Sequence, residues 1–146
     1  MIKSPKFPNL NPNNHAITSP QTEDYNCIGW AAGDVDRVWW PVNHPLGYWP
    51  LPIPPESTVQ AFIAAFATLG YRQCANGDFE ANYEKVVLYV DGRKKPTHMA
   101  RQLRDGNWTS KLGPSFDIRH STPAAVNGSE YGTVHTFMKR PYQQAI

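Results

Sequence analysis

The stretch Tyr25-Asn26-Cys27-Ile28-Gly29-Trp30 contains the residues best suited to covalent chemistry. Cys27 follows two polar residues of the helix-capping type, Asp24 and Asn26, which predicts that it lies in the first turn of a short helix. Backbone N–H groups without partners and the positive end of the helix dipole favour a thiolate at that position. Because the thiolate is the nucleophile, Cys27 is the candidate catalytic cysteine.

A cysteine nucleophile needs a base and a group that orients the base. Among the histidines, His98 has the best context, because it lies on a predicted strand, Pro96–Leu103, far from Cys27 in the sequence. Its role would be to accept the thiol proton and later to deliver it. The rival bases are His120 and His135, and the weaker candidates in Pro/Asn loops are His15 and His44.

The group that would orient the imidazole is open between Ser110, Asp117 and Asn107. A carboxylate stabilises an imidazolium best, which favours Asp117 on charge. Asn107 offers an amide instead. Asp117 also precedes His120 closely, so these two groups are a second possible pair.

Asp105-Gly106 predicts a two-residue hairpin turn between the strand of His98 and the next strand. In that register Lys111 shares the face of His98, and Ser110 lies on the other face unless a bulge shifts the pairing. Lys111 is therefore a candidate for binding a carboxylate of the substrate.

The elements that would hold these groups indicate an α+β fold. One helix is predicted from Asp24 to about Ala32, with Gly33 as its cap and a possible continuation through Val38. A second helix opens with the capping-box pattern Ser57-Thr58-Val59-Gln60. Apolar runs between turn signals predict strands at Tyr83–Val90, Pro96–Leu103, Trp108–Leu112 and Tyr131–Met138, with a short element of unspecified type at Asp117–His120. Consecutive strands joined by turns favour an antiparallel meander centred on the strand of His98, with the helices packed on it.

Two segments lack a regular pattern. Residues 1–23 are rich in Pro and Asn and are interpreted as an extended N-terminal arm, which leaves residues 24–146 as a single catalytic domain. The Trp/Pro-rich segment 39–55 is interpreted as aromatic packing over the core, with one wall of a substrate cleft as the alternative. Cys74 is expected in a loop without a catalytic role.

Composition limits the classes of partner. A net charge of +2 gives no case for nucleic acid or an anionic membrane surface as the main partner. The sequence lacks an apolar stretch of membrane-spanning length and a secretion signal, which favours the cytoplasm, with secretion as an effector by another route left open. The spacing of Cys and His does not suggest a metal site, so no metal or cofactor is expected.

These motifs resemble the NlpC-type cysteine peptidases of the papain-like superfamily. The stretch around Cys27 is similar to that family's Tyr-Asp-Cys-Ser-Gly motif, with Asn26 replacing the aspartate. His98 is similar to the histidine that opens the family's second core strand. Ser110 falls where the family has a polar third residue, commonly His, Asn or Gln. The resemblance covers roughly residues 24–112 and implies a papain-like fold.

The chain also resembles a small bacterial family without an assigned activity. The shared features are an Asn-Cys helix start, the segment Trp39-Trp40-Pro41, the pattern His-x-Ala-x-Gln-Leu from His98, and Trp-x-Ser-Lys-Leu-Gly from Trp108. The similarity to known families thus implies a catalytic class and no substrate.

The sequence thus predicts a cysteine hydrolase, a peptidase or amidase that acts on a peptide or protein through an acyl-enzyme. Cys27 attacks, His98 is the base and then the acid, and Ser110 or Asp117 orients it. The expected oxyanion and substrate contacts are Asn26, Tyr25, Trp30 and Lys111. Two alternatives stay open: a transglutaminase or deamidase effector with the same Cys-His pair, and a non-catalytic protein-binding domain on the same fold.

Overall fold

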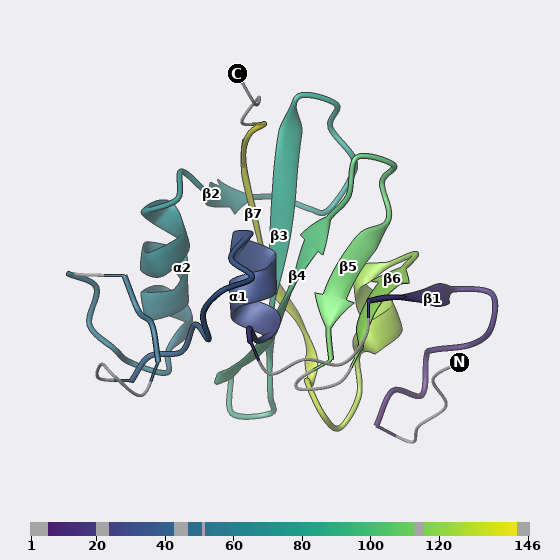
Figure 1. Cartoon of the computed structure of the whole chain (residues 1–146), viewed down its shortest axis with the longest axis horizontal. Helices are drawn as coiled ribbons and strands as arrows, with labels where there is room; N and C mark the ends of the chain where they lie inside the picture. The colour runs from purple at the N-terminus through teal and green to yellow at the C-terminus, as the bar shows by residue number, and fades with distance from the viewer. Residues whose placement is uncertain (1–5, 20–23, 43–46, 51, 113–115, 143–146) are drawn as a thin grey trace.

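The computed structural model describes residues 6–19, 24–42, 47–50, 52–112 and 116–142 of the 146-residue chain. Figure 1 shows a curved sheet with α1 and α2 on one side. In chain order the elements are β1 (His15–Ser19), α1 (Cys27–Ala32), α2 (Val59–Ala67), β2 (Arg72–Cys74), β3 (Tyr83–Val90), β4 (Pro96–Gln102), β5 (Trp108–Lys111), β6 (Asp117–His120), the 3₁₀ helix η1 (Pro123–Val126) and β7 (Thr133–Pro141).

Within the described residues the strands form a seven-stranded sheet in the order β1-β6-β5-β4-β3-β7-β2. All of its pairings are antiparallel. The predicted meander is confirmed from β3 to β5, and the short element at Asp117–His120 extends it as β6. β7 then returns to the other edge of β3, and β1 and β2 form the two edges of the sheet. The chain therefore combines a largely antiparallel sheet with few helices.

Capping residues determine where both helices begin. The side chain of Asn26 accepts a hydrogen bond from the Gly29 N–H at the start of α1, as a cap residue should. α1 ends at Gly33, whose φ of 81° is left-handed, so the predicted cap is confirmed and the continuation through Val38 is wrong. The cap of α2 is Thr58, one residue later than the capping-box pattern placed it.

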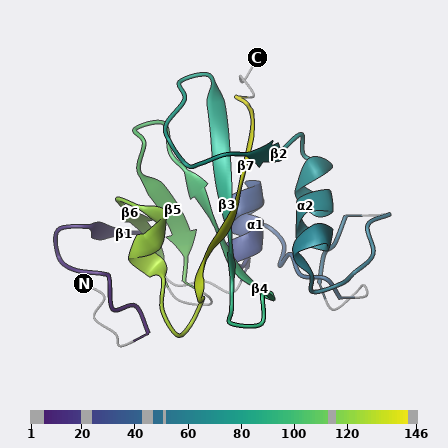
Figure 2. The ribbon, with the colours of Figure 1, turned by 180° about the vertical axis from the view of Figure 1, so that it is seen from behind.

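The two faces of the sheet carry separate apolar cores. The face under α1 and α2, here called the helix face, buries a core that includes Cys27, Ile28, Phe62, Phe66, Val86, Leu88 and Met99. The opposite face buries a core that includes Phe7, Val87, Tyr89, Ala100, Trp108, Val126 and Tyr131. Figure 2, seen from behind, shows η1 in front of β5 and β6 on this second side. Because side chains alternate along a strand, neighbouring residues belong to different cores.

Two expectations about irregular segments change, and a third agrees with the structure. Residues 15–19 of the predicted arm form β1, which pairs with β6, and Phe7 is buried, so the described part of the arm belongs to the packed domain. Cys74 ends β2 and does not lie in a loop. Trp39 and Trp49 are buried in the helix-face core, which agrees with the packing interpretation of the Trp/Pro segment.

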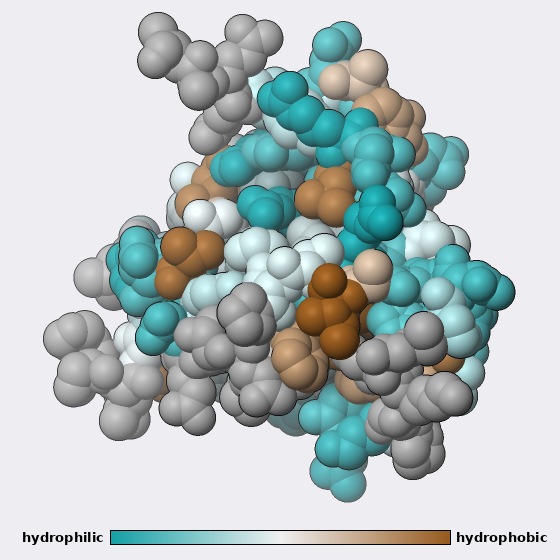
Figure 3. Space-filling model, turned by 45° about the vertical axis from the view of Figure 1, so that its right-hand side comes forward, coloured by the Kyte–Doolittle hydropathy of each residue, from teal (hydrophilic) through white to brown (hydrophobic). Residues whose placement is uncertain are grey.

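The described surface is mainly hydrophilic. Figure 3 shows one side of it, where apolar side chains appear as separate patches among polar ones. The exposed large apolar residues are Ile17, Val35, Val38 and Phe79. In the part of the chain that is described, no helix is long and apolar enough to cross a membrane.

Candidate functional site

The hairpin between β4 and β5 has a turn one residue longer than predicted. Gln102 pairs with Trp108, and the Leu103 N–H donates to the Asn107 carbonyl at 2.7 Å. Gly106 has a φ of 88°, which is the usual conformation of a glycine that closes such a turn with a bulge. The register therefore shifts by one position. Ser110, and not Lys111, shares the face of His98.

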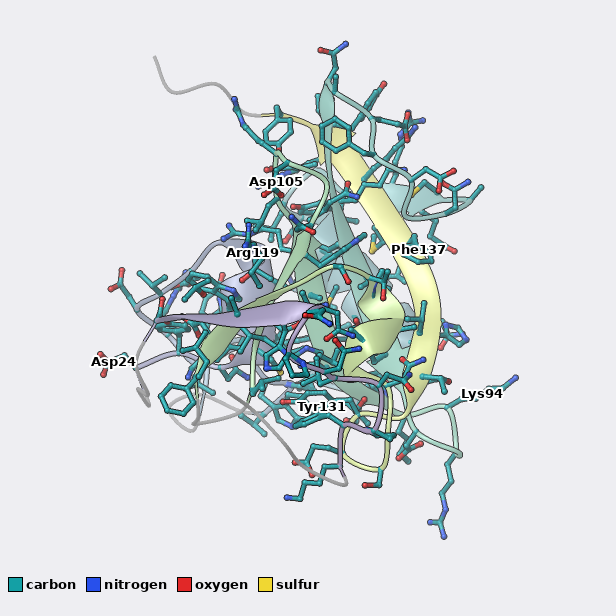
Figure 4. All side chains as sticks on the ribbon, turned by 90° about the vertical axis from the view of Figure 1, so that its right-hand side faces the viewer. Asp24, Lys94, Asp105, Arg119, Tyr131 and Phe137 are labelled. Atoms are coloured by element: carbon teal, nitrogen blue, oxygen red, sulfur yellow. The ribbon has the colours of Figure 1, made fainter. Side chains whose placement is uncertain are left out.

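The predicted Cys27–His98 pair is not formed, because the two side chains lie on opposite faces of the sheet. Cys27 belongs to the helix-face core with Met99, and the Met99 backbone N–H is hydrogen-bonded to its sulfur. His98 precedes Met99 on β4 and so points the other way, where its ring stacks on Tyr131 at a centroid distance of 3.9 Å. In Figure 4, which views the sheet from the β1 side, Asp24 lies on the side of α1 and Tyr131 lies away from it.

The helix face instead brings Cys27 together with three polar residues, and we call this group the thiol cluster: Tyr25, Cys27, Lys111 and Asp117. Burial raises the pKa of the Cys27 thiol to about 11. The backbone N–H groups of Met99, Ile28 and Cys27 itself, and the charge of Lys111, act in the opposite direction and favour the thiolate. α1 has six residues, so these local donors matter more than a helix dipole.

Lys111 and Asp117 are opposite each other in the β5–β6 pairing, and both are fully buried. Burial lowers the pKa of Lys111, while the negative charges of Asp117 and of an ionised Cys27 raise it. The Lys111 ammonium lies 5.1 Å from the centroid of the Tyr25 ring. The predicted contact of Asp117 with His98 or His120 is wrong, since Asp117 lies on the helix face and both histidines lie on the other.

A hydrogen bond joins Tyr25 to Asp117. The Tyr25 hydroxyl donates to Asp117 Oδ2 at 2.5 Å, and burial together with this bond raises the pKa of Tyr25 to about 12. The other carboxylate oxygen, Oδ1, is buried and has no hydrogen-bond partner among the described residues. The cluster thus contains a thiol, an amine and a carboxylate within one desolvated environment.

Asn26 has a structural role in place of the predicted oxyanion contact. Its Oδ1 accepts hydrogen bonds from the Gly29 and Trp39 N–H groups at 3.0 and 2.9 Å. Its Nδ2 donates to the Trp39 carbonyl at 2.7 Å. An aspartate, as in the NlpC-type motif, could not make this last bond because it lacks a donor. Asn26 therefore fastens the start of α1 to the Trp/Pro segment.

Trp30 lies at the outer side of the thiol cluster. It is half-buried, and its ring stacks on Tyr25 with centroids 5.4 Å apart. Its indole N–H donates to Thr109 Oγ1 on β5 at 3.0 Å. The Arg101 guanidinium lies over the Trp30 ring, 5.1 Å from its centroid. Sequence reasoning missed Arg101, although its position next to Ala100 on β4 places it on the helix face.

The opposite face holds a chain of buried hydrogen bonds that we call the histidine network: His98, Ser110 and His120. Ser110 Oγ lies 3.0 Å from His98 Nε2 and 2.7 Å from His120 Nε2. His120 Nδ1 lies 2.8 Å from the Thr122 carbonyl. The predicted contact between His98 and Ser110 is present, although it is remote from Cys27.

The carbonyl of Thr122 determines which atoms donate and which accept in the hydrogen bonds of this network. A carbonyl only accepts, so His120 Nδ1 carries the proton and Nε2 accepts from the Ser110 hydroxyl. Ser110 Oγ can then accept from His98 Nε2–H, which leaves His98 Nδ1 as a buried acceptor without a partner among the described residues. Burial lowers the pKa of His98 well below its usual value and that of His120 to about 4, so both are neutral near pH 7.

Of the other candidates, His15 and Asn107 line one pocket with His120 of the histidine network, whereas His135 lies on β7. His15 pairs with His120 across β1 and β6, and His135 Nδ1 contacts Thr136 Oγ1 on β7. The Asn107 backbone N–H binds Asp105 at the end of the turn. His44 lies outside the described residues. Within the described ranges, His, Cys, Asp and Glu side chains form no group of three that could hold a metal ion.

Comparison with known proteins gives one result. No curated protein and no solved structure matches the chain. A family match covers residues 16–139, from β1 into β7, and so includes both the thiol cluster and the histidine network. The chain therefore belongs to the family described as Domain of unknown function (DUF7689).

Proposed function

We propose that the chain is a cysteine hydrolase that cleaves an amide-type bond, with Cys27 as the nucleophile and Lys111, in place of His98, as its partner. One observation supports this proposal above the others. Three backbone N–H groups and a lysine ammonium act together on the Cys27 sulfur, and each favours a negative charge there. A buried cysteine with only a packing role requires none of these groups.

The directions of the pKa shifts indicate how Cys27 and Lys111 share the proton during the reaction. Burial lowers the pKa of Lys111 and raises that of Cys27 to about 11, so burial favours the neutral form of both the amine and the thiol. When the Lys111 amine is neutral, it accepts the thiol proton during attack and returns it to the leaving group, as lysine does in serine–lysine hydrolases. The N–H groups beside the sulfur are the donors available to the developing oxyanion.

Papain-like architecture belongs to the same proposal. The position of Cys27 at the start of a helix that packs on an antiparallel meander supports a papain-like architecture. The position of His98 on the opposite face of the sheet argues against it. Lys111, on the strand next to that of His98, supplies the cationic group on the side where the thiol lies.

A non-catalytic binding domain is the second candidate, and the burial of the thiol favours it. Cys27 is 7% exposed, and its raised pKa suppresses the thiolate at neutral pH. On this alternative the N–H groups and Lys111 stabilise packing alone, and the half-buried Tyr25 and Trp30 form a recognition surface.

The test is acylation of Cys27 in the folded protein. p-Nitrophenyl acetate is added at pH 7 to 10, and acetyl-Cys27 is mapped by mass spectrometry in wild type, Lys111→Met and His98→Gln. We expect labelling that rises with pH, falls at least tenfold in Lys111→Met and changes less than twofold in His98→Gln. Cys74, which is partly exposed, serves as the internal reference thiol.

Two results would overturn the proposal. Acylation of Cys27 only after unfolding would support the binding domain. A loss in His98→Gln equal to that in Lys111→Met would restore His98 as the base.

A further inference from the structure

Asp117 carries a buried carboxylate oxygen that lacks a donor. The side chain is 0% exposed, and its Oδ2 accepts from Tyr25. Its Oδ1 has no hydrogen-bond partner among the described residues. Four other buried polar atoms of the described residues also lack a partner, and Asp117 Oδ1 differs from them because it belongs to the thiol cluster. A bound donor would replace the water that this oxygen lost on burial.

The neighbours of Asp117 restrict what that donor can be. Lys111 interacts electrostatically with the Asp117 carboxylate and with Cys27. The same lysine therefore acts on the residue with the unpaired oxygen and on the proposed nucleophile. The rings of Tyr25 and Trp30 stack at the half-buried outer side of the cluster. A flat, narrow group with N–H donors fits beside two stacked rings more readily than a branched one does.

We propose, on the basis of the cysteine chemistry proposed above, that the substrate is a primary carboxamide, the side chain of glutamine or asparagine in a peptide or protein. One N–H of the carboxamide donates to Asp117 Oδ1 while Cys27 attacks the carbonyl carbon. An ester or thioester has no N–H to offer. A backbone peptide bond continues on both sides and cannot present a narrow end to two buried groups.

The reaction balances without a further reagent. The Cys27 sulfur bonds to the carboxamide carbon, the C–N bond breaks, and the nitrogen leaves as ammonia with the thiol proton carried by Lys111. Water, or a primary amine, then attacks the thioester, the C–S bond breaks and the thiol is restored. Water gives a carboxylic acid, which is deamidation, and an amine gives a substituted amide.

The experiment compares two acyl donors that give one product. Benzyloxycarbonyl-Gln-Gly and its γ-methyl ester analogue are each incubated with the full chain and hydroxylamine, and the common γ-hydroxamate is measured. We expect the carboxamide to react at least as well as the ester, although free esters are the more reactive donors.

A matched pair of variants locates the effect. Tyr25→Phe removes the hydroxyl bond and keeps Asp117, whereas Tyr25→Phe with Asp117→Leu removes the carboxylate without leaving the hydroxyl unpaired. The second change should lower carboxamide turnover at least tenfold more than ester turnover, which a general loss of folding would not do. If the double variant does not fold, the two donors on wild type decide the question.

Each outcome has one meaning. Turnover of the ester without the carboxamide overturns the substrate assignment and keeps the cysteine hydrolase. Equal losses for both donors in the double variant also overturn the role of Asp117. Turnover of neither donor, with Cys27 unacylated, overturns the proposed function itself.

Discussion

The thiol cluster and the histidine network share strands β5 and β6, on which their residues point to opposite faces. β5 supplies Lys111 to the first and Ser110 to the second, and β6 supplies Asp117 and His120. The thiol cluster combines opposite charges and an orphan oxygen. The histidine network is neutral, and its hydrogen bonds run in one direction. The charged groups of this pair therefore lie on the helix face, whereas the opposite face has the character of a structural network.

Removing the carboxylate of the thiol cluster should have the largest effect. Asp117→Ala leaves the Tyr25 hydroxyl without its acceptor and removes a negative charge that acts on Lys111, and we expect a loss of about 3 kcal/mol in the free energy of unfolding. Urea denaturation measures it. The control is Asp36→Ala, an exposed carboxylate, which should change stability by less than about 0.5 kcal/mol. Equal effects would show that the cluster is solvated.

The histidine network should make stability depend on pH between 7 and 5. The folded pKa of His98 and His120 lies below the unfolded value of about 6.5, so the unfolded state binds protons first as pH falls. Stability is then lost on acidification, by on the order of 2 kcal/mol per histidine at pH 5. The raised pKa values of Cys27 and Tyr25 lie above this window. His120→Gln should remove the part of the pH dependence of stability that comes from His120. A free energy of unfolding that does not change between pH 7 and 5 in wild type would contradict the buried network.

Ser110→Ala should separate the two regions further. The change leaves His98 Nε2 and His120 Nε2 without their shared partner, at a cost of about 2 kcal/mol. Acylation of Cys27 should stay within twofold of wild type, because the serine lies on the other face. Ser121→Ala, at an exposed position, is the matched control. Slower acylation in Ser110→Ala would join the two regions into one site.

Asn26→Asp should give the smallest effect, about 1 kcal/mol, because aspartate keeps the cap but loses the donor to the Trp39 carbonyl. The added negative charge should also raise the pKa of Cys27 and slow its acylation. Thr58→Asp at the start of α2 is the control, since Thr58 only accepts from the Ala61 N–H there. Thermal unfolding of both variants is the measurement, and equal shifts would contradict the role of the amide.

The sequence was informative wherever local rules decide the structure. Capping residues placed Cys27 at the start of α1, and alternation placed His98 and Ala100 on one face of β4. Local rules could not show which face α1 covers, because that depends on packing between distant segments. The predicted base was therefore assigned to the wrong side. β2 has three residues, too few for a pattern, and His15–Ser19 lacks the alternation that would have marked β1.

One additional residue in the turn at Asp105 changes which side chains of β5 share a face with those of β4. The Asp-Gly pair suggested the shorter hairpin, and the longer one places Gly106 in its left-handed conformation. Because the side-chain period of a strand is two, this difference exchanged Ser110 and Lys111 between the faces. A turn of one residue more thus determines which polar group lies beside the thiol.

The position of β7 has a consequence for the synthesis of the chain. β3 lies between β4 and β7, and β2 pairs with β7, although β7 comes last in the sequence among the described strands. On the ribosome the segment from β3 to β6 can assemble early. One edge of β3, and the whole of β2, remain without a paired strand until β7 has been made. The domain can close only after Pro141 has left the exit tunnel, so a chain that stops before β7 would expose the Val86–Val90 strand to association with other chains.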